Sequence, residues 1–195
     1  MERYKRIWLW MIIPMIVMQA GIFYDYWGDF AENTWAVHVH YWLASVWYLF
    51  LIAQPWLFAH GRLETHRTVG IIGLFLAGGV AFTAIGQLNR DIIYANFVAE
   101  NPGGIGPFEP WFFLGIAISE IILISAFIAA VMMAIIKRKS LEDHAWWLIS
   151  TVFIIMMPAL ARGVQNGFIA VYGFEPGLDI VVMPPIYLGQ VLVIS

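Results

Sequence analysis

The sequence predicts an all-α fold, a polytopic bundle of about six transmembrane helices with both termini on the cytoplasmic side. Hydrophobic residues make up 62% of the 195 residues and charged residues 12%, whereas soluble domains carry about 25% charged residues. The apolar residues form long runs, and about 20 such residues are needed to cross a membrane. Basic residues gather at those ends of the runs that would lie on one side of the membrane, as the positive-inside rule requires. The chain, 1–195, is therefore interpreted as a single integral-membrane domain.

The first and last predicted spans each contain proline. Pro14 lies in the first span, where neighbouring helices can satisfy the carbonyl that proline leaves free. No small-residue cleavage signature follows this span, so we interpret it as retained rather than as a cleaved signal peptide. Pro184 and Pro185 interrupt the last span, which is short, and whether it crosses fully stays open. The six predicted spans are about 7–24, 35–58, 68–88, 111–136, 144–163 and 178–194.

The segments between the spans differ in composition. The segments 89–110 and 163–179 are interpreted as outer loops, and the first contains a Pro- and Gly-rich cluster typical of turns. The span 68–88 is rich in glycine, which lets helix backbones approach closely in lipid. We therefore expect this span to be the most centrally packed helix.

The charges fix the orientation. Eight of the ten basic residues fall on one face of the six-span arrangement, while the connections on the other face are mostly acidic. The basic face is therefore expected in the cytoplasm. The eight residues are Arg3, Lys5, Arg6, Arg62, Arg67, Lys137, Arg138 and Lys139.

Composition excludes several classes of site. The chain has no cysteine, so disulfides, thiolate metal sites and iron–sulfur clusters are excluded. Without a basic patch, nucleic acid is not an expected partner, whereas the lipid bilayer is. Walker, Gly-x-Ser-x-Gly and His-Glu-x-x-His motifs are lacking, so nothing favours an ATPase, a serine hydrolase or a zinc protease.

The polar residues inside the spans fall into two layers. The outer layer consists of His40, Gln87, Glu120 and Arg162. Glu120 lies nine residues after Trp111, about 13 Å along a helix, where an unpaired carboxylate costs several kcal/mol. Two interpretations stay open: a structural ion pair between Glu120 and Arg162, or a polar pocket for a quinone, a lipid head group or a proton.

The inner layer lies near the cytoplasmic face and consists of Gln54, His66, Arg67 and His144. His66 and His144 open two different helices in the same leaflet, an arrangement that a b-type haem with two histidine ligands requires. Alternatively, these histidines bond to loop carbonyl groups, or contact phospholipid head groups together with Arg67. No separate metal site is predicted, because His38 and His40 point to different sides of a helix.

Several of these residues form a spaced pattern. His40 precedes Gln54 by 14 residues, and His144 precedes Arg162 by 18. The pattern is His40, Gln54, His66-Arg67-Thr-Val-Gly70, His144-Ala-Trp-Trp147 and Arg162. Over about residues 38–165 it resembles a bacterial family of multipass membrane proteins of unknown function, from which Ser150 departs because relatives usually carry a basic residue there. The resemblance implies a bacterial inner-membrane location and supplies no activity.

The chain also bears a looser likeness to the four-helix b-type transmembrane cytochromes that reduce iron or oxidise ascorbate. That likeness implies a possible b-type haem at His66 and His144. In those proteins the ligands sit deeper and usually form two pairs. Here His40 has no histidine partner in its leaflet, so two such haems are not expected.

Three functions stay open, and whether the chain is an enzyme is not predicted. The best supported is a redox- or quinone-associated membrane component with a polar pocket in the outer leaflet. The second is an accessory subunit of a larger membrane complex, in contact with other membrane subunits. The third is a small proton or solute transporter gated by Glu120, although the stretch between Gln54 and Glu120 is nearly all apolar.

Overall fold

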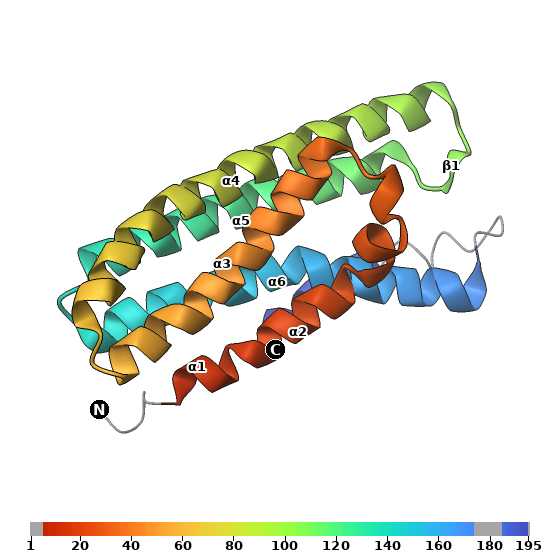
Figure 1. Ribbon diagram of the computed structural model, residues 1–195. Coiled ribbons are helices and arrows are strands. Elements are labelled where there is room, and N and C mark those ends of the chain that lie inside the picture. Colours follow the sequence, from red (N-terminus) through yellow and green to blue (C-terminus); the bar gives the residue numbers. More distant parts are fainter. Residues whose placement is uncertain (1–5, 174–184, 195) are drawn as a thin grey trace.

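The computed structural model describes residues 6–173 and 185–194, and this part of the chain is almost entirely helical (Figure 1). Four of its helices are long and apolar enough to cross a membrane: α3 (Trp35–Ala59), α4 (Leu63–Glu100), α5 (Pro110–Ile136) and α6 (Leu141–Tyr172). The shorter elements are α1 (Ile7–Trp10), α2 (Ile12–Gly21), the wide π-helical turn η2 (Phe23–Gly28), the 3-10 turn η3 (Phe30–Glu32), the strand β1 (Gly104–Pro107) and α8 (Pro185–Ile194). The predicted all-helical membrane bundle is confirmed at this level.

The long helices form an antiparallel bundle. Helix α3 packs against α4, α4 against α5 and α5 against α6, while α2 and α8 both pack against α6 (Figure 1). Short connections force consecutive helices to run antiparallel. The α3–α4 turn and the α5–α6 connection therefore share one end of the bundle, and β1 lies at the other, which we call the outer end (Figure 1).

Four of the six predicted spans correspond to helices that meet the length and composition needed for crossing, and the other two are not confirmed. The first predicted span, 7–24, is interrupted at Met11 and ends as a regular α-helix at Gly21. The last predicted span, 178–194, begins outside the described residues, which include it only as the ten-residue helix α8, so its crossing stays a prediction.

The predicted outer loops are wrong over part of their length. Helix α4 continues through 89–100 and α6 continues to Tyr172. The segment 89–100 contains no glycine or proline, and its residues Asp91, Ala95 and Val98 are buried at helical spacing. The local polarity of this segment indicated a loop, but the buried stripe keeps it helical against α5. As a consequence, Asp91 belongs to the bundle interior and not to a loop.

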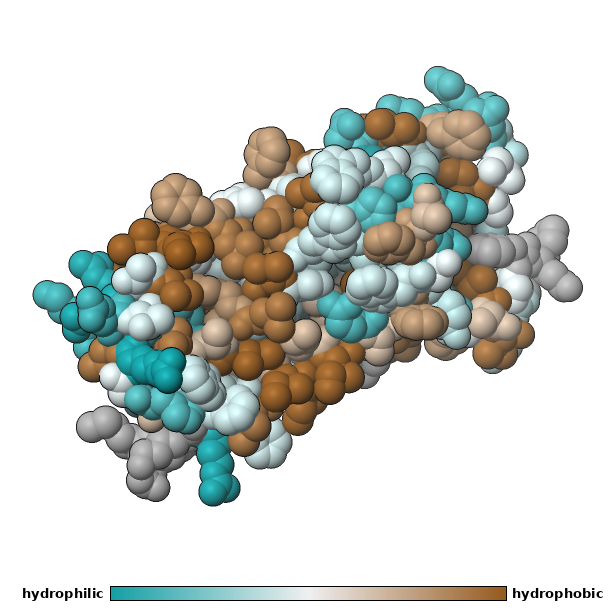
Figure 2. Space-filling model, viewed as in Figure 1, coloured by the Kyte–Doolittle hydropathy of each residue, from teal (hydrophilic) through white to brown (hydrophobic). Residues whose placement is uncertain are grey.

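The surface has the pattern expected when lipid is the solvent. Hydrophobic side chains cover the middle of the face shown in Figure 2, and hydrophilic residues lie at its two ends. Phe75 and Phe82 are 80% and 76% exposed, which would be unfavourable in water and suits contact with acyl chains. Arg62 and the basic residues 137–139 lie at the end opposite β1 (Figure 1). That this end faces the cytoplasm stays a prediction.

The centre of the bundle joins α3 to α6. Trp47 and Tyr48 are each 1% exposed. The Trp47 Nε1 donates to Thr151 Oγ1 at 3.0 Å, and the Tyr48 hydroxyl donates to the Val152 carbonyl at 2.7 Å. A buried donor without a partner is costly, so these two bonds let large aromatic side chains fill the core.

Helices α2 and α6 cross at two glycines. A Cβ added to Gly163 would lie 2.8 Å from the Cα of Gly21, and one added to Gly21 would collide with the Ala159 carbonyl. Only glycine allows this approach of two backbones. The crossing places the η2 turn, which follows α2 directly, beside the outer part of α6.

Gly163→Ala should lower stability by about 1–3 kcal/mol, because the new methyl group would press the two backbones apart. The thermal unfolding midpoint of the detergent-solubilised protein measures this loss. Gly167→Ala is the matched control, since a Cβ at Gly167 meets no atom within 4 Å, and alanine there should be neutral or stabilising by about 0.5–1 kcal/mol. Equal midpoints for the two variants would contradict the close crossing.

Candidate functional site

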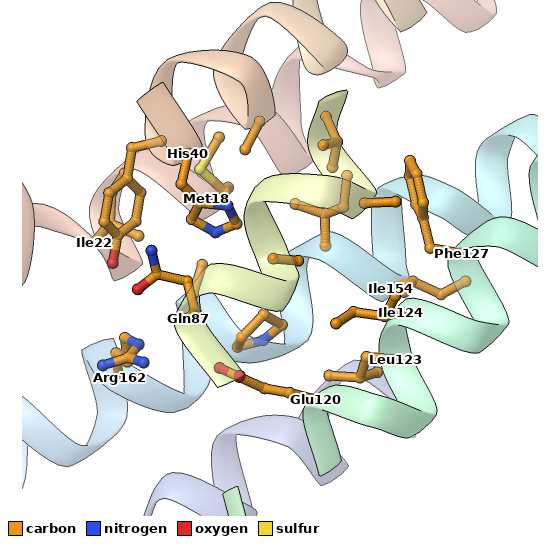
Figure 3. A pocket seen from close by; sticks show the side chains of 18 residues that line it. Met18, Ile22, His40, Gln87, Glu120, Leu123, Ile124, Phe127, Ile154 and Arg162 are labelled. Carbon is orange, nitrogen blue, oxygen red and sulfur yellow. The ribbon is translucent and has the colours of Figure 1, made fainter. Parts of the chain in front are cut away.

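A cavity of about 100 Å³ lies among α2, α3, α4, α5 and α6. Its lining includes His40 from α3, Gln87 from α4, Glu120 from α5 and Arg162 from α6 (Figure 3). The structure thus brings together the four residues that the sequence assigned to the outer layer. A cavity of ~150 Å³ binds benzene, so this one has room for several waters or for much of a six-membered ring.

The cavity has a polar and an apolar side. Gln87, Glu120 and Arg162 lie on one side, and Phe127 and Ile154 lie on the other (Figure 3). Such a lining suits a molecule that is apolar over most of its surface and carries a few hydrogen-bonding atoms.

His40 is held by α4. Its Nδ1 lies 3.2 Å from Thr83 Oγ1, and the Thr83 hydroxyl donates to the carbonyls of Gly79 and Val80. Because the hydroxyl proton is used within α4, the Thr83 oxygen acts as acceptor and Nδ1 of His40 carries the donated hydrogen. The other ring nitrogen, Nε2, has no partner among the described residues and is available to a ligand.

Asp91 is a site residue that the sequence reasoning missed. It is 3% exposed, and its Oδ1 accepts from the neighbouring Arg90 at 3.1 and 3.3 Å. Its Oδ2 and the Oε2 of Glu120 are buried and have no hydrogen-bond partner in the described part of the chain. The charge of Asp91 acts directly on Glu120, together with those of Arg162 and Arg90. Its spacing in the sequence could have indicated the site, because Asp91 lies one helical turn after Gln87.

The ion pair between Glu120 and Arg162, one of the two interpretations that the sequence left open, is not formed. Within the described residues, Arg162 instead pairs with Asp25, with Nη1 and Oδ2 3.6 Å apart. The Asn166 side-chain amide donates to the same carboxylate. Asp25 reaches α6 because the Gly21–Gly163 crossing brings the η2 turn against it. Asp25 lies between the first two predicted spans, 7–24 and 35–58, and no local pattern in the sequence indicated this contact.

The inner layer is arranged differently. The Nδ1 of His66 lies 3.3 Å from the Gln54 carbonyl, and the Nδ1 of His144 lies 2.8 Å from the Ala134 carbonyl. Ala134 is in the last turn of α5, where carbonyls lack helical partners, so His144 ties the start of α6 to the end of α5. The charges of His144 and Arg67 act on His66, which places these side chains near one another.

The inner histidines thus bond to carbonyl groups, but these carbonyls belong to the helices α3 and α5 and not to loops as expected. In the described ranges, no group of three or more His, Cys, Asp or Glu side chains could hold a metal ion. The haem at His66 and His144 stays a prediction without structural support. The side-chain Nε2 of Gln54 is buried without a hydrogen-bond partner within the described residues, and we have no physical account of it.

Asp25→Asn should destabilise the protein by about 1–3 kcal/mol, between the values for exposed and buried ion pairs, because Arg162 loses its counter-charge. The side chains of Arg162 and Asp25 are 22% and 27% exposed, so the ion pair is neither fully exposed nor fully buried. Thermal unfolding in detergent tests this. Asp29→Asn, in the same acidic turn but exposed, is the control and should leave the midpoint unchanged. A loss of the same size in the control would show that the turn, and not the ion pair, is responsible.

No protein-family model, curated protein or solved structure matches this chain significantly. The resemblance to the bacterial family of multipass membrane proteins and the looser likeness to b-type cytochromes therefore stay predictions. The candidate site rests on its own geometry.

Proposed function

We propose that this chain is a membrane component that binds the ring of a quinone-type molecule in the cavity of Figure 3. The observation that carries the proposal is the two-sided lining within a membrane-type bundle, with polar groups from four helices facing apolar side chains. A quinone ring is flat and apolar and has two carbonyl acceptors. The Gln87 amide can supply a donor to such an acceptor, and the unprotonated Nε2 of His40 can accept from the hydroxyl of the reduced, quinol form.

The charges favour an uncharged ligand over a phosphate head group. Both guanidinium groups near the cavity are already engaged, Arg162 with Asp25 and Arg90 with Asp91. A bound phosphate would have to compete with these carboxylates and would face Glu120 as well. A neutral ring leaves both ion pairs intact.

The core argues against a continuous polar path for a solute. Trp47 and Tyr48 lie between the outer and inner layers, and both are almost fully buried. Their polar atoms are bonded to Thr151 and Val152. A transporter would need polar groups along this depth.

Electron transfer to the ring would require a separate redox partner, so the proposal concerns binding. Association with further membrane subunits stays a prediction from the sequence.

His40→Leu should raise the Kd for a short-chain ubiquinol analogue about tenfold, because the hydrogen bond from the quinol hydroxyl to Nε2, worth ~1.4 kcal/mol, is lost. Titration of the analogue into the protein in lipid nanodiscs, followed by tryptophan fluorescence, measures the affinity. His60→Leu is the matched control, because His60 is exposed in the α3–α4 turn and should not alter Kd. Non-saturable binding to the wild type, or equal effects of the two variants, would refute the proposal.

A further inference from the structure

We propose that Asp91 on α4 and Glu120 on α5 form a proton-binding pair, in which one proton is held between the two carboxyl groups and is taken up and released by them as a unit. The inference concerns a different ligand from the quinone-type ring and does not depend on it. It identifies a proton site at Glu120, which lines the cavity (Figure 3), and at Asp91, which does not line it.

The first argument is hydrogen bonding. Asp91 is 3% exposed, and its Oδ2 is buried without a partner, as is the Oε2 of Glu120, among the described residues. An ionised carboxylate can only accept, so two ionised groups cannot satisfy each other. Adding one proton turns one carboxyl into a donor and the other into its acceptor. Since the two side chains act directly on one another, a single proton would satisfy both orphaned oxygens.

The second argument is charge. Among the described residues, two guanidinium groups (Arg90 and Arg162) and three carboxyl groups (Asp25, Asp91 and Glu120) make up the charged cluster around Glu120 and Arg162. Arg90 is 3.1 Å from Asp91, and Arg162 is 3.6 Å from Asp25, so Glu120 is the carboxyl without a cationic partner of its own. With one proton the five groups are neutral in sum, and without it they carry one negative charge. An unpaired charge inside a membrane costs several kcal/mol, which favours the protonated cluster.

Every packed element contributes groups to this environment. Helix α3 supplies His40 and Tyr41, which line the same cavity as Glu120. Helix α8 supplies Tyr187, whose hydroxyl donates to the Phe112 carbonyl at 3.4 Å. None of these adds a fixed positive charge that could replace the proton.

Release of the proton would have a defined consequence. The O–H bond on one carboxyl breaks, both carboxylates become ionised, and the cluster gains one negative charge beside His40 and Arg162. Because Glu120 lines the cavity, this change is felt by whatever occupies it. The pair would thus couple proton uptake to the charge of the site.

Infrared spectroscopy of the full-length protein in nanodiscs tests the inference through the carbonyl stretching band of a protonated carboxyl. At pH about 6, isolated carboxyl groups are ionised, and we expect the wild type to show one such band from a buried group. Isotope labelling of Asp and of Glu separately should shift the band with both labels, since the proton is shared. This measurement needs no substitution, so it does not depend on how variants fold.

Two variants distinguish a proton shared by two carboxyl groups from a proton held by a single buried carboxyl group. Glu120→Gln should abolish the band, because no second carboxyl group is then left to share a proton with Asp91. Asp91→Asn should abolish it too, because Glu120 then faces an unpaired Arg90. Glu64→Gln, at an exposed position, is the control and should retain the band. Absence of the band in the wild type, or its survival in Asp91→Asn, would overturn the inference, whereas failure of quinone binding would leave it untouched.

Discussion

The outer part of this bundle is organised by one constraint, that charged side chains inside a membrane-type core need counter-charges from within the bundle. Arg162 obtains its partner from Asp25 and Arg90 from Asp91. The first of these contacts joins η2 to α6, whereas the second lies between adjacent residues of α4. Glu120 is the remaining carboxyl, and its buried oxygen without a partner among the described residues marks the place where the packing is incomplete. The cavity is located at this place.

The fold and the charges depend on one another. Arg162 can reach Asp25 only because Gly21 and Gly163 let α2 lie directly on α6. The wide η2 turn then carries Asp25 across the end of α6, where it also binds Asn166. Neither the contact between the two glycines nor the ion pair alone would explain the role of α2 in the site. Together they show why a short N-terminal helix, too short to cross a membrane regularly, is part of the site.

The sequence predicted the depth of the site residues in the membrane better than it predicted their ion-pair and hydrogen-bond partners. The basic residues at the ends of the apolar runs mark the same side of the membrane for every helix, so the depth of each polar residue can be counted from them. His40, Gln87, Glu120 and Arg162 were assigned to one layer in this way, and the structure brings them to one cavity. Partners depend on the path of the chain between helices, which no local pattern encodes. Asp25 and Asp91 were therefore missed. The residues 89–91 were assigned to a predicted loop, but α4 continues to Glu100 and buries Asp91.

A map of the protein in nanodiscs made from its native membrane, determined by electron cryomicroscopy, tests the central claim that the cavity is a ligand site. The account predicts flat, ring-sized density between His40 and Phe127, with polar contacts on the side of Gln87 and Glu120. A cavity closed by side chains, or one filled by an acyl chain without polar contacts, would contradict it.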